Sequence, residues 1–249
     1  MSNYSAVPVS TIGDNRRTGQ LSVVNALGAA ILRGDFAIGA NLPNEAELTA
    51  RFSVSRTVIR EVMKTLAAKG LVIAKTKIGT RVADKVNWNM FDSDVILWRC
   101  QAGIDGPFLK NLFEIRLAVE PTGAALAAER RTDADMVNIR RCLNAMAAPG
   151  HSNYSFVAAD LEFHIAIAIA SYNPFMTSIR PVIEASLNGS LTSQSPVNNA
   201  NLLRIHMATH TAVADAIEAG DARGARRAMI EVIDDGILAR GGDLKGLPT

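Results

Sequence analysis

The stretch Leu42–Val72, which reads LPNEAELTARFSVSRTVIREVMKTLAAKGLV, decides the fold of the first third of the chain. Asn44 followed three residues later by Glu47 is a capping-box pattern, and it predicts the start of a short helix. A tight turn then leads to Ser55, which is placed to cap a second helix that Gly70 ends. Two helices joined by a tight turn predict a helix-turn-helix.

The second helix of this pair has two different faces. Its apolar residues recur at the spacing of one buried face, namely Ile59, Val62, Met63 and Leu66. Another face is basic and holds Arg56, Arg60 and Lys64. An arginine near a helix N-terminus can reach the O6 and N7 atoms of guanine in the major groove, and the helix terminus can bind phosphate. This face predicts a recognition helix, although solvated basic faces are also common on helices.

The flanking residues extend the motif. Residues 18–33 have a helical apolar spacing, and residues 71–83 alternate apolar and polar side chains around a turn, as two short strands do. Helix, helix, turn, helix and hairpin is the order of a winged helix-turn-helix. The hairpin adds Lys75, Lys77 and Arg81, and we count Lys77 among the expected DNA contacts. We therefore expect a DNA-binding domain at residues 18–85, after a flexible arm at residues 1–17.

The charge distribution agrees with this division. The 249-residue chain has a net charge of only +2, but residues 1–85 hold 12 Lys/Arg and 6 Asp/Glu, whereas residues 86–249 hold 14 and 18. A basic segment joined to a mildly acidic body is typical of a DNA-binding module attached to a second module. A chance asymmetry would give the same counts.

Neither the cysteines nor the apolar segments indicate a secreted or membrane protein. Cys100 and Cys142 have no metal-ligand spacing and form no disulfide framework, so we expect both as small apolar residues in a reducing cytosol, with a disulfide as the alternative. Residues 1–17 lack the apolar core of a signal peptide. The apolar run Ile165–Ala170 is too short to span a bilayer. We expect a cytoplasmic protein that does not contact membranes.

The second part of the chain predicts helices alone. Residues 86–105 are expected to be a linker, and residues 106–240 a domain followed by a tail at 241–249. Amphipathic helices are expected at about residues 107–130, 133–146, 152–171, 174–191, 201–219 and 222–239. The predicted fold class is mainly α: an N-terminal winged helix-turn-helix and a C-terminal all-α antiparallel helical bundle.

Polar residues within this bundle suggest a binding site. Asp160 and His164 lie four residues apart, so both leave one helix face, and a later helix repeats the spacing with His206 and His210. A carboxylate and an imidazole one turn apart can form half of a metal site, but a buried histidine is more often a hydrogen-bonded core residue. Arg116 lies among apolar neighbours and needs an anionic partner.

That partner is either Glu120, four residues further on, or the carboxylate of an acidic effector that Arg116 would bind with two hydrogen bonds.

The stretch Leu42–Val72, with the wing sequence IGTRV, resembles the winged helix of the GntR family of bacterial regulators. The resemblance implies that four residues of the recognition helix contact operator DNA, and that a wing glycine enters the minor groove. These residues are Ser55, Arg56, Thr57 and Arg60, with Gly79 on the wing. Ala46 departs from the family, because many members have an arginine there, which implies a different operator.

The segments DLEFH, Asn173-Pro174 and HTAVADAIEAGD resemble the C-terminal ligand-binding domain of the FadR-type branch of this family. Many members of the branch bind a divalent metal, often zinc, through an aspartate and three histidines. The resemblance implies that Asp160, His164 and His210 are three of these ligands. Val232 stands at the position of the usual fourth ligand. The site therefore either leaves one coordination position of the metal open or binds no metal. His206 would point toward the end of the pocket.

The string FEIRLAVEP places Arg116 where an arginine lines the effector pocket in this branch, and we also expect Asn173 to contact the effector. With WNMFDSDVILW, at residues 88–98, the string resembles family members that sense sugar acids, although the similarity weakens between Ser190 and Arg204. The resemblance implies a homodimeric repressor of a carbohydrate-acid operon that leaves its palindromic operator when a small carboxylate binds. The alternative is a metal-dependent hydrolase, although we find no general base or nucleophile motif.

Overall fold

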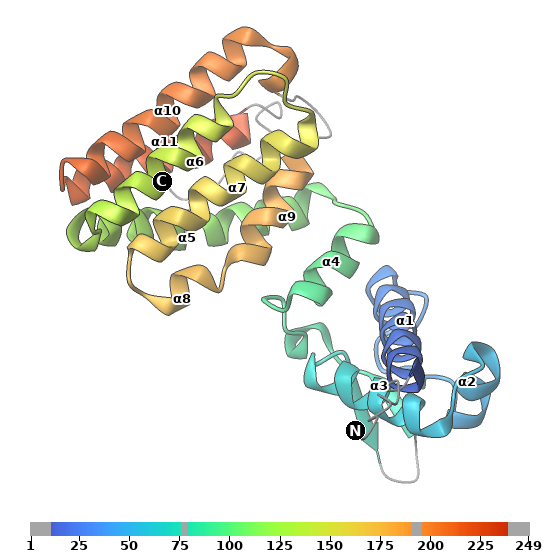
Figure 1. The fold of residues 1–249 in the computed structure, drawn as a ribbon. Helices are drawn as coiled ribbons and strands as arrows, with labels where there is room; N and C mark the ends of the chain where they lie inside the picture. The colour runs from blue at the N-terminus through green and yellow to red at the C-terminus, as the bar shows by residue number, and fades with distance from the viewer. Residues whose placement is uncertain (1–10, 76–78, 191–195, 239–249) are drawn as a thin grey trace, which may run out of the picture. The chain divides into compact units, whose positions relative to one another are not determined.

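The computed structural model describes residues 11–75, 79–190 and 196–238 (Figure 1). The chain forms two compact units, Met1–Gly103 and Ile104–Thr249, which are described separately below. Both units are built mainly from helices, so the predicted fold class is confirmed. Among the described residues, no helix is both long and apolar enough to cross a membrane.

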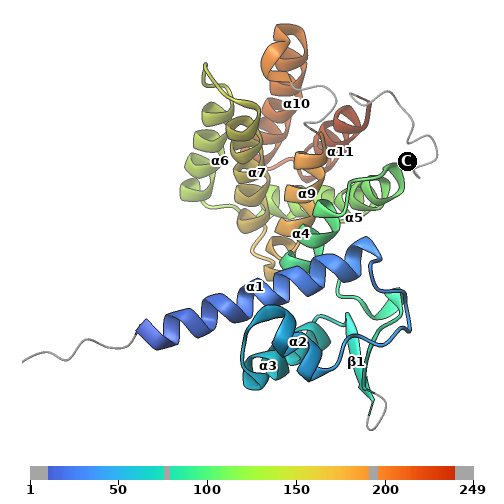
Figure 2. The same cartoon turned by 90° about the vertical axis from the view of Figure 1, so that its right-hand side faces the viewer.

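The N-terminal unit has the element order of a winged helix-turn-helix. Its elements are α1 (Thr11–Arg33), α2 (Glu45–Phe52), α3 (Arg56–Ala68), β1 (Val72–Lys75), β2 (Gly79–Val82), η1 (Lys85–Asn87) and α4 (Ser93–Gln101). The two strands pair antiparallel, with Val72 opposite Val82 and Lys75 opposite Gly79. Figure 2 shows α1 lying across α2 and α3, and α1 packs against α3.

The expected capping residues begin α2 and α3. The Asn44 side chain accepts a hydrogen bond from the Glu47 amide at 3.0 Å, and the Asn44 amide donates to the Glu47 carboxylate at 2.8 Å, which completes the capping box. Ser53 makes the turn between the helices with a positive φ of 53°. The Ser55 hydroxyl accepts from the Val58 amide at 3.3 Å. Local sequence therefore sets where the recognition helix starts.

The first helix begins earlier than expected. We predicted a flexible arm at residues 1–17 and a helix from Thr18, but α1 starts at Thr11, so residues 11–17 are helical. These residues contain one glycine and no proline, and nothing in them stops the helix from extending toward the N-terminus.

The predicted linker at residues 86–105 contains a helix that belongs to the N-terminal unit. Trp98 of α4 is 1% exposed, and its indole nitrogen donates to the Asn25 side chain at 3.2 Å. A Cβ on Gly28 of α1 would lie 2.4 Å from the Trp98 ring, so only glycine allows this approach. The burial of Trp98 against α1 is the physical reason that residues 93–101 form part of this unit.

The end of α3 is also joined to the start of α4. Lys69 donates to the Asp92 carboxylate at 2.7 Å, and Asp92 caps α4 by accepting from the Asp94 and Val95 amides. Gly70 has a φ of 76°, and a Cβ there would lie 1.8 Å from the Asn87 carbonyl oxygen. The residues that follow α3 are therefore joined to η1 by a close backbone approach and to the start of α4 by a half-buried ion pair.

The C-terminal unit is the expected helical bundle. Its elements are α5 (Gly106–Arg130), α6 (Asp133–Met146), α7 (Asn153–Ala170), α8 (Pro174–Thr177), α9 (Arg180–Ser190), η2 (Pro196–Asn198), α10 (Ala200–Glu218) and α11 (Ala222–Leu238). Helix α11 packs against α5 and α10, and α7 packs against α5, α6 and α9. The side chains of Phe113, Ile139, Phe163, Ile217 and Ile233 are fully buried at its centre.

One expected helix, at residues 174–191, is divided in two. The Thr177 and Ser178 hydroxyls donate to the Pro174 carbonyl at 2.9 and 3.2 Å. Hydroxyl groups that bond nearby backbone atoms compete with regular helix hydrogen bonds. Helix α8 ends there, and α9 starts at Arg180.

The burial of Trp98 leads to a stability prediction. We expect Trp98→Ala to lower the free energy of unfolding of the N-terminal unit by about 3–5 kcal/mol, because it leaves a large cavity against α1. Leu97→Ala is the matched control: Leu97 is the neighbouring residue but is 51% exposed, and its loss should cost under about 1 kcal/mol. Urea denaturation followed by far-UV circular dichroism measures both. Equal effects would mean that α4 is only a linker.

Candidate DNA-binding face and candidate metal centre

The recognition helix α3 separates a buried face from an exposed one. Ile59, Val62 and Leu66 are 0% exposed, whereas Arg56, Thr57 and Arg60 are exposed on the first two turns. The hydroxyl of Ser55 caps the helix at the same end. The residues expected to contact DNA in this helix therefore lie together on its outer N-terminal part.

Arg60 has a partner that the sequence pattern did not reveal. Its Nε donates to the two Glu45 carboxylate oxygens at 3.0 and 3.2 Å, from the first turn of α2. Both side chains are largely exposed, so the pair contributes little to stability. Glu45 instead restricts where the Arg60 guanidinium points at the exposed face.

The wing presents a glycine as expected. Gly79 has a φ of 105°, a left-handed conformation that favours glycine, and no heavy atom lies within 4 Å of a Cβ placed there. Arg81 is held by its Nε donating to the Asn41 side chain at 3.1 Å. Ala46 is exposed on α2. It cannot make the DNA contact expected of the arginine that many family members have at this position. Lys77, expected to contact DNA, lies outside the described residues.

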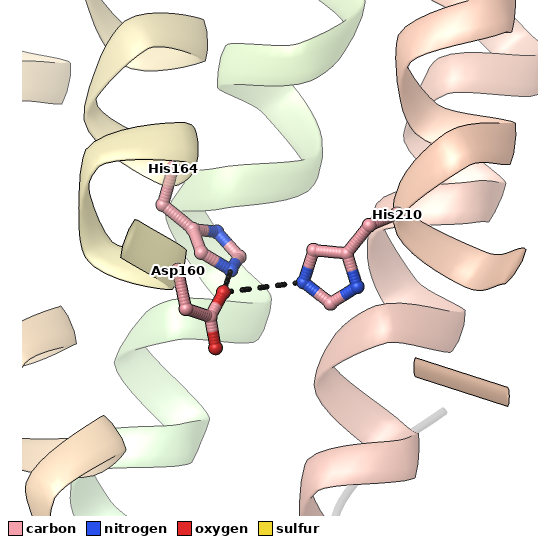
Figure 3. Close-up of side chains that lie close together, drawn as sticks. All are labelled: Asp160, His164 and His210. Carbon is pink, nitrogen blue, oxygen red and sulfur yellow. Dashed lines mark hydrogen bonds and ion pairs between the residues drawn. The ribbon is translucent and has the colours of Figure 1, made fainter. Parts of the chain in front are cut away.

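In the helical unit, the three predicted metal ligands come together. Asp160 and His164 extend from α7 and His210 from α10, and Figure 3 shows the two imidazoles meeting at one carboxylate oxygen. Asp160 Oδ1 lies 3.3 Å from His164 Nε2 and 3.2 Å from His210 Nε2. One ligand atom from each residue lies within 4.8 Å of the others, and all three residues are buried.

The outer nitrogens of both rings have acceptors of their own. His164 Nδ1 makes an ion-pair contact with Glu120 Oε2 of α5, and His210 Nδ1 lies 2.7 Å from the His206 carbonyl oxygen. An acceptor beside Nδ1 keeps a proton on that atom, which leaves the Nε2 lone pair facing inward. Such carboxylate–histidine and carbonyl–histidine contacts are typical of metal-binding imidazoles.

This arrangement fits a divalent cation. With Nδ1 protonated, each neutral imidazole would direct an Nε2 lone pair at Asp160 Oδ1, and two acceptors repel each other at these distances. Either an added proton on an imidazole or a positive ion between the three groups removes the repulsion. Two imidazole nitrogens and a carboxylate oxygen are the donor set that zinc prefers.

The position of the usual fourth ligand is apolar. Val232 on α11 is 6% exposed and belongs to the hydrophobic core. His206, which the sequence places toward the end of the pocket, comes closer to the cluster than expected. Its ring stacks on His210 with 4.0 Å between centroids, and its Nε2 lies 3.6 Å from Asp160 Oδ2.

Arg116 lies beside the cluster and has protein partners. Its Nε donates to Glu120 at 2.5 Å, its Nη1 donates to Ser186 of α9 at 3.0 Å, and its Nη2 is 3.3 Å from His164 Nε2. The first of the two alternatives from the sequence, a pair with Glu120, is therefore present. Ser186 was not predicted, because nothing in its spacing marks a serine as the partner of a residue 70 positions away.

The charges of the cluster shift several pKa values. Burial alone would raise the pKa of Glu120, but Arg116 and His164 lower it to about 2. Burial alone would lower the pKa of His164, but Glu120 and Asp160 raise it to about 9. Burial and the neighbouring His210 lower the pKa of His206 to about 3. Without a metal, the cluster therefore contains a protonated His164 between two carboxylates.

Asn173 does not belong to this cluster. Its side chain caps the short helix α8 by accepting from the Phe175 amide at 3.1 Å, and its own amide donates to the Ser171 hydroxyl at 3.2 Å. These contacts explain the Asn173-Pro174 pair as a helix start, and they do not support the expected effector contact.

Space beside the cluster is small. A cavity of about 10 Å³ borders Glu120 and His164 and is otherwise lined mainly by apolar side chains of α5, α7, α8, α9 and α11. This volume is at the lower limit of what a single water molecule needs. A larger ligand can enter beside Glu120 only if side chains move.

Comparison with known proteins assigns a family model to each of the two units. A family model described as bacterial regulatory proteins, gntR family, matches residues 20–82, and a model of the FCD domain matches residues 111–235. The chain belongs to the GntR family. Members of this family are transcription regulators, so the chain is a DNA-binding regulator, and the alternative of a metal-dependent hydrolase is wrong.

Individual relatives cover most of this GntR regulator. The galactonate operon transcriptional repressor of Escherichia coli is 33% identical over 85% of this chain and 92% of its own length. The Uxu operon regulator of Haemophilus influenzae is 27% identical over 88% and 79%. The solved structure of Listeria monocytogenes Lar covers 94% of this chain and 98% of its own, with a TM-score of 0.56 and 17% identity, and shares the fold.

The raised pKa of His164 predicts a pH-dependent stability. A pKa near 9 in the folded state and 6.5 in the unfolded state stabilises the protein below pH 6.5, and this stabilisation disappears as the pH rises through 9. With chelator present, the free energy of unfolding of the helical unit should fall by about 3 kcal/mol over this range.

Urea titrations at several pH values measure this fall, and His164→Gln should remove it. The same pH dependence in wild type and variant would contradict the assignment to His164.

Proposed function

We propose that this GntR regulator is a cytoplasmic repressor of an operon for carbohydrate-acid catabolism, and that a small carboxylate such as a sugar acid releases it from its operator. The observation that carries the proposal is the buried cluster of Asp160, His164, His210 and Arg116 in the helical unit. Buried polar groups are costly in a core unless they serve a structural or binding role. The printed names of the two relatives, which regulate the galactonate and Uxu operons, support the same class of role.

The operator is proposed to be a palindrome bound by a homodimer. One recognition helix offers few base contacts, here those of Arg56 and Arg60 with their neighbours Ser55 and Thr57. A second copy on a symmetric half-site multiplies both affinity and specificity. Gly79 and Lys77 of the wing are proposed to approach the adjacent groove and backbone.

Asp160, His164 and His210 are proposed to hold a divalent cation, with zinc preferred by the donor set. Three protein ligands leave at least one coordination position for an oxygen of water or effector. When bound, zinc supplies a positive centre that attracts carboxylate and hydroxyl oxygens. The side chain of Glu120 orients His164 for this task through its contact with Nδ1.

The charges of the site favour a monoanionic effector. Arg116 and a divalent cation together carry three positive charges, and Glu120 and Asp160 carry two negative ones, so the loaded site has an excess of one positive charge. An effector carboxylate neutralises that excess. Because Arg116 already contacts Glu120 and Ser186, the effector must displace one of these contacts, and the resulting shift of α5 against α9 is proposed to start the response.

The DNA-binding face is tested with Arg60→Ala. An operator is first selected from random-sequence DNA by the wild-type protein, and fluorescence anisotropy then measures binding. Each lost guanine contact is worth about 1–3 kcal/mol, so a dimer should lose at least about 30-fold in affinity.

Arg51→Ala is the control, because Arg51 is an exposed arginine at the other end of α2 and should keep specific binding. Tight, sequence-specific binding by Arg60→Ala would exclude this face.

The effector site is tested by thermal shift with sugar acids, fatty acids and amino acids, with and without chelator. Zinc should raise the melting temperature of wild type, and a sugar acid should raise it further only when zinc is present. Arg116→Lys keeps the charge but not the two-bond geometry, and it should weaken the acid response more than the zinc response. An acid response that survives chelation would argue against a metal in the site.

A further inference from the structure

The polar cluster of the helical unit is built from two residue pairs with the same spacing. Asp160 and His164 lie four residues apart on α7, and His206 and His210 lie four residues apart on α10. Two side chains at this spacing leave one face of a helix together, and two histidines so placed are a frequent zinc-binding pair. Each of the two helices therefore presents two residues that can bind a metal.

Both histidines of α10 reach the same carboxylate. Their rings stack with 4.0 Å between centroids and 25° between planes. His210 Nε2 lies 3.2 Å from Asp160 Oδ1, and His206 Nε2 lies 3.6 Å from Asp160 Oδ2. In Figure 3, both dashed lines end at Oδ1, and the other carboxylate oxygen points away from the two imidazoles drawn there. His206 therefore approaches Asp160 at its second oxygen.

The nitrogen of His206 that faces Asp160 makes no hydrogen bond. Within the part of the chain that the structure describes, His206 Nε2 is buried without a hydrogen-bond partner, because 3.6 Å is too long for one. A buried polar atom left unpaired costs about 1–3 kcal/mol, so such an atom indicates an ion, a ligand or an ordered water beside it. A cation held by this nitrogen and the Asp160 carboxylate would satisfy both groups.

The distances suit one ion shared by four side chains. Zinc–nitrogen bonds of about 2.0–2.1 Å place tetrahedral ligand atoms about 3.3 Å apart. The contacts of Asp160 with His164, His210 and His206 are 3.3, 3.2 and 3.6 Å, close to that separation. Asp160, His164 and His210 are the compact part of the set, and their side chains are at most 4% exposed. His206 is the outermost member, at 23% exposed, and it has to move inward to complete the site.

We propose that His206 is the fourth protein ligand of the metal site, and that it replaces the histidine which many members of the branch have at the position of Val232. The inference rests on the proposed metal site of Asp160, His164 and His210. Val232 is apolar, so α11 supplies no ligand atom at that position. The site takes two ligands from α7 and two from α10 instead. Zinc can expand to five ligands, so an effector oxygen still has a position.

A different role for His206 is to support His210 by stacking alone. His206→Phe separates the two roles, because phenylalanine keeps an aromatic ring beside His210 but has no nitrogen. His151→Phe is the matched control. His151 is also partly exposed and also lies beside Phe156, as His206 does, but both of its ring nitrogens already have hydrogen-bond partners.

The test measures zinc binding by the purified full chain. Competition with a chelator of known affinity gives the zinc affinity, and X-ray absorption of the zinc-loaded protein counts the bound imidazoles. Wild type and His151→Phe should each show three imidazoles, and His206→Phe should show two. The affinity of His206→Phe should fall at least about 100-fold, because losing a residue that only supports a ligand already costs about 10–100-fold.

Cobalt(II) serves as a second probe, since its visible spectrum reports the coordination geometry. The spectrum of the cobalt-loaded protein should change in His206→Phe and stay like that of wild type in His151→Phe. Circular dichroism of both variants confirms that they fold.

Two outcomes would overturn the inference and leave the three-residue site intact. One is an equal number of bound imidazoles in wild type and His206→Phe, whatever the affinities, which would make His206 a supporting residue only. The other is an equal loss of zinc affinity in His151→Phe and His206→Phe, since the loss would then not depend on a ligating nitrogen. If wild type binds no zinc, the proposed metal site itself fails, and the inference fails with it.

Discussion

A single carboxylate oxygen organises the helical unit. Asp160 Oδ1 lies within 3.3 Å of imidazole nitrogens from α7 and α10. The Nδ1 atom of each imidazole contacts an acceptor, which is Glu120 for His164 and a backbone carbonyl for His210. Because these groups are buried, their charges interact strongly and tolerate few other arrangements. The packing of α5, α7, α9 and α10 around the cluster depends on satisfying them.

This constraint also makes the cluster suitable for sensing a ligand. A buried network with balanced charges is stable in a few discrete arrangements, and an added ion or carboxylate changes which of them is best. Arg116 connects α5 to α9 through Ser186, so a change in its partners acts on two helices at once. A core of apolar residues alone would have no comparable response to a small anion.

In the N-terminal unit, the corresponding constraint lies behind the recognition helix. The indole of Trp98 fills the space above Gly28, and Lys69 pairs with the cap of α4. These contacts join α4 to α1 and α3, so the three helices form one packed body.

The sequence by itself determined the winged helix-turn-helix, because caps, turns and the two faces of α3 depend on residues close together in the chain. It also determined that Asp160 and His164 share a helix face, and the family resemblance added His210. Only the tertiary structure decided the partners contributed by other helices: Glu45 for Arg60 and Ser186 for Arg116. Those pairings depend on how the helices pack in space, and the spacing of residues along one helix does not predict that packing.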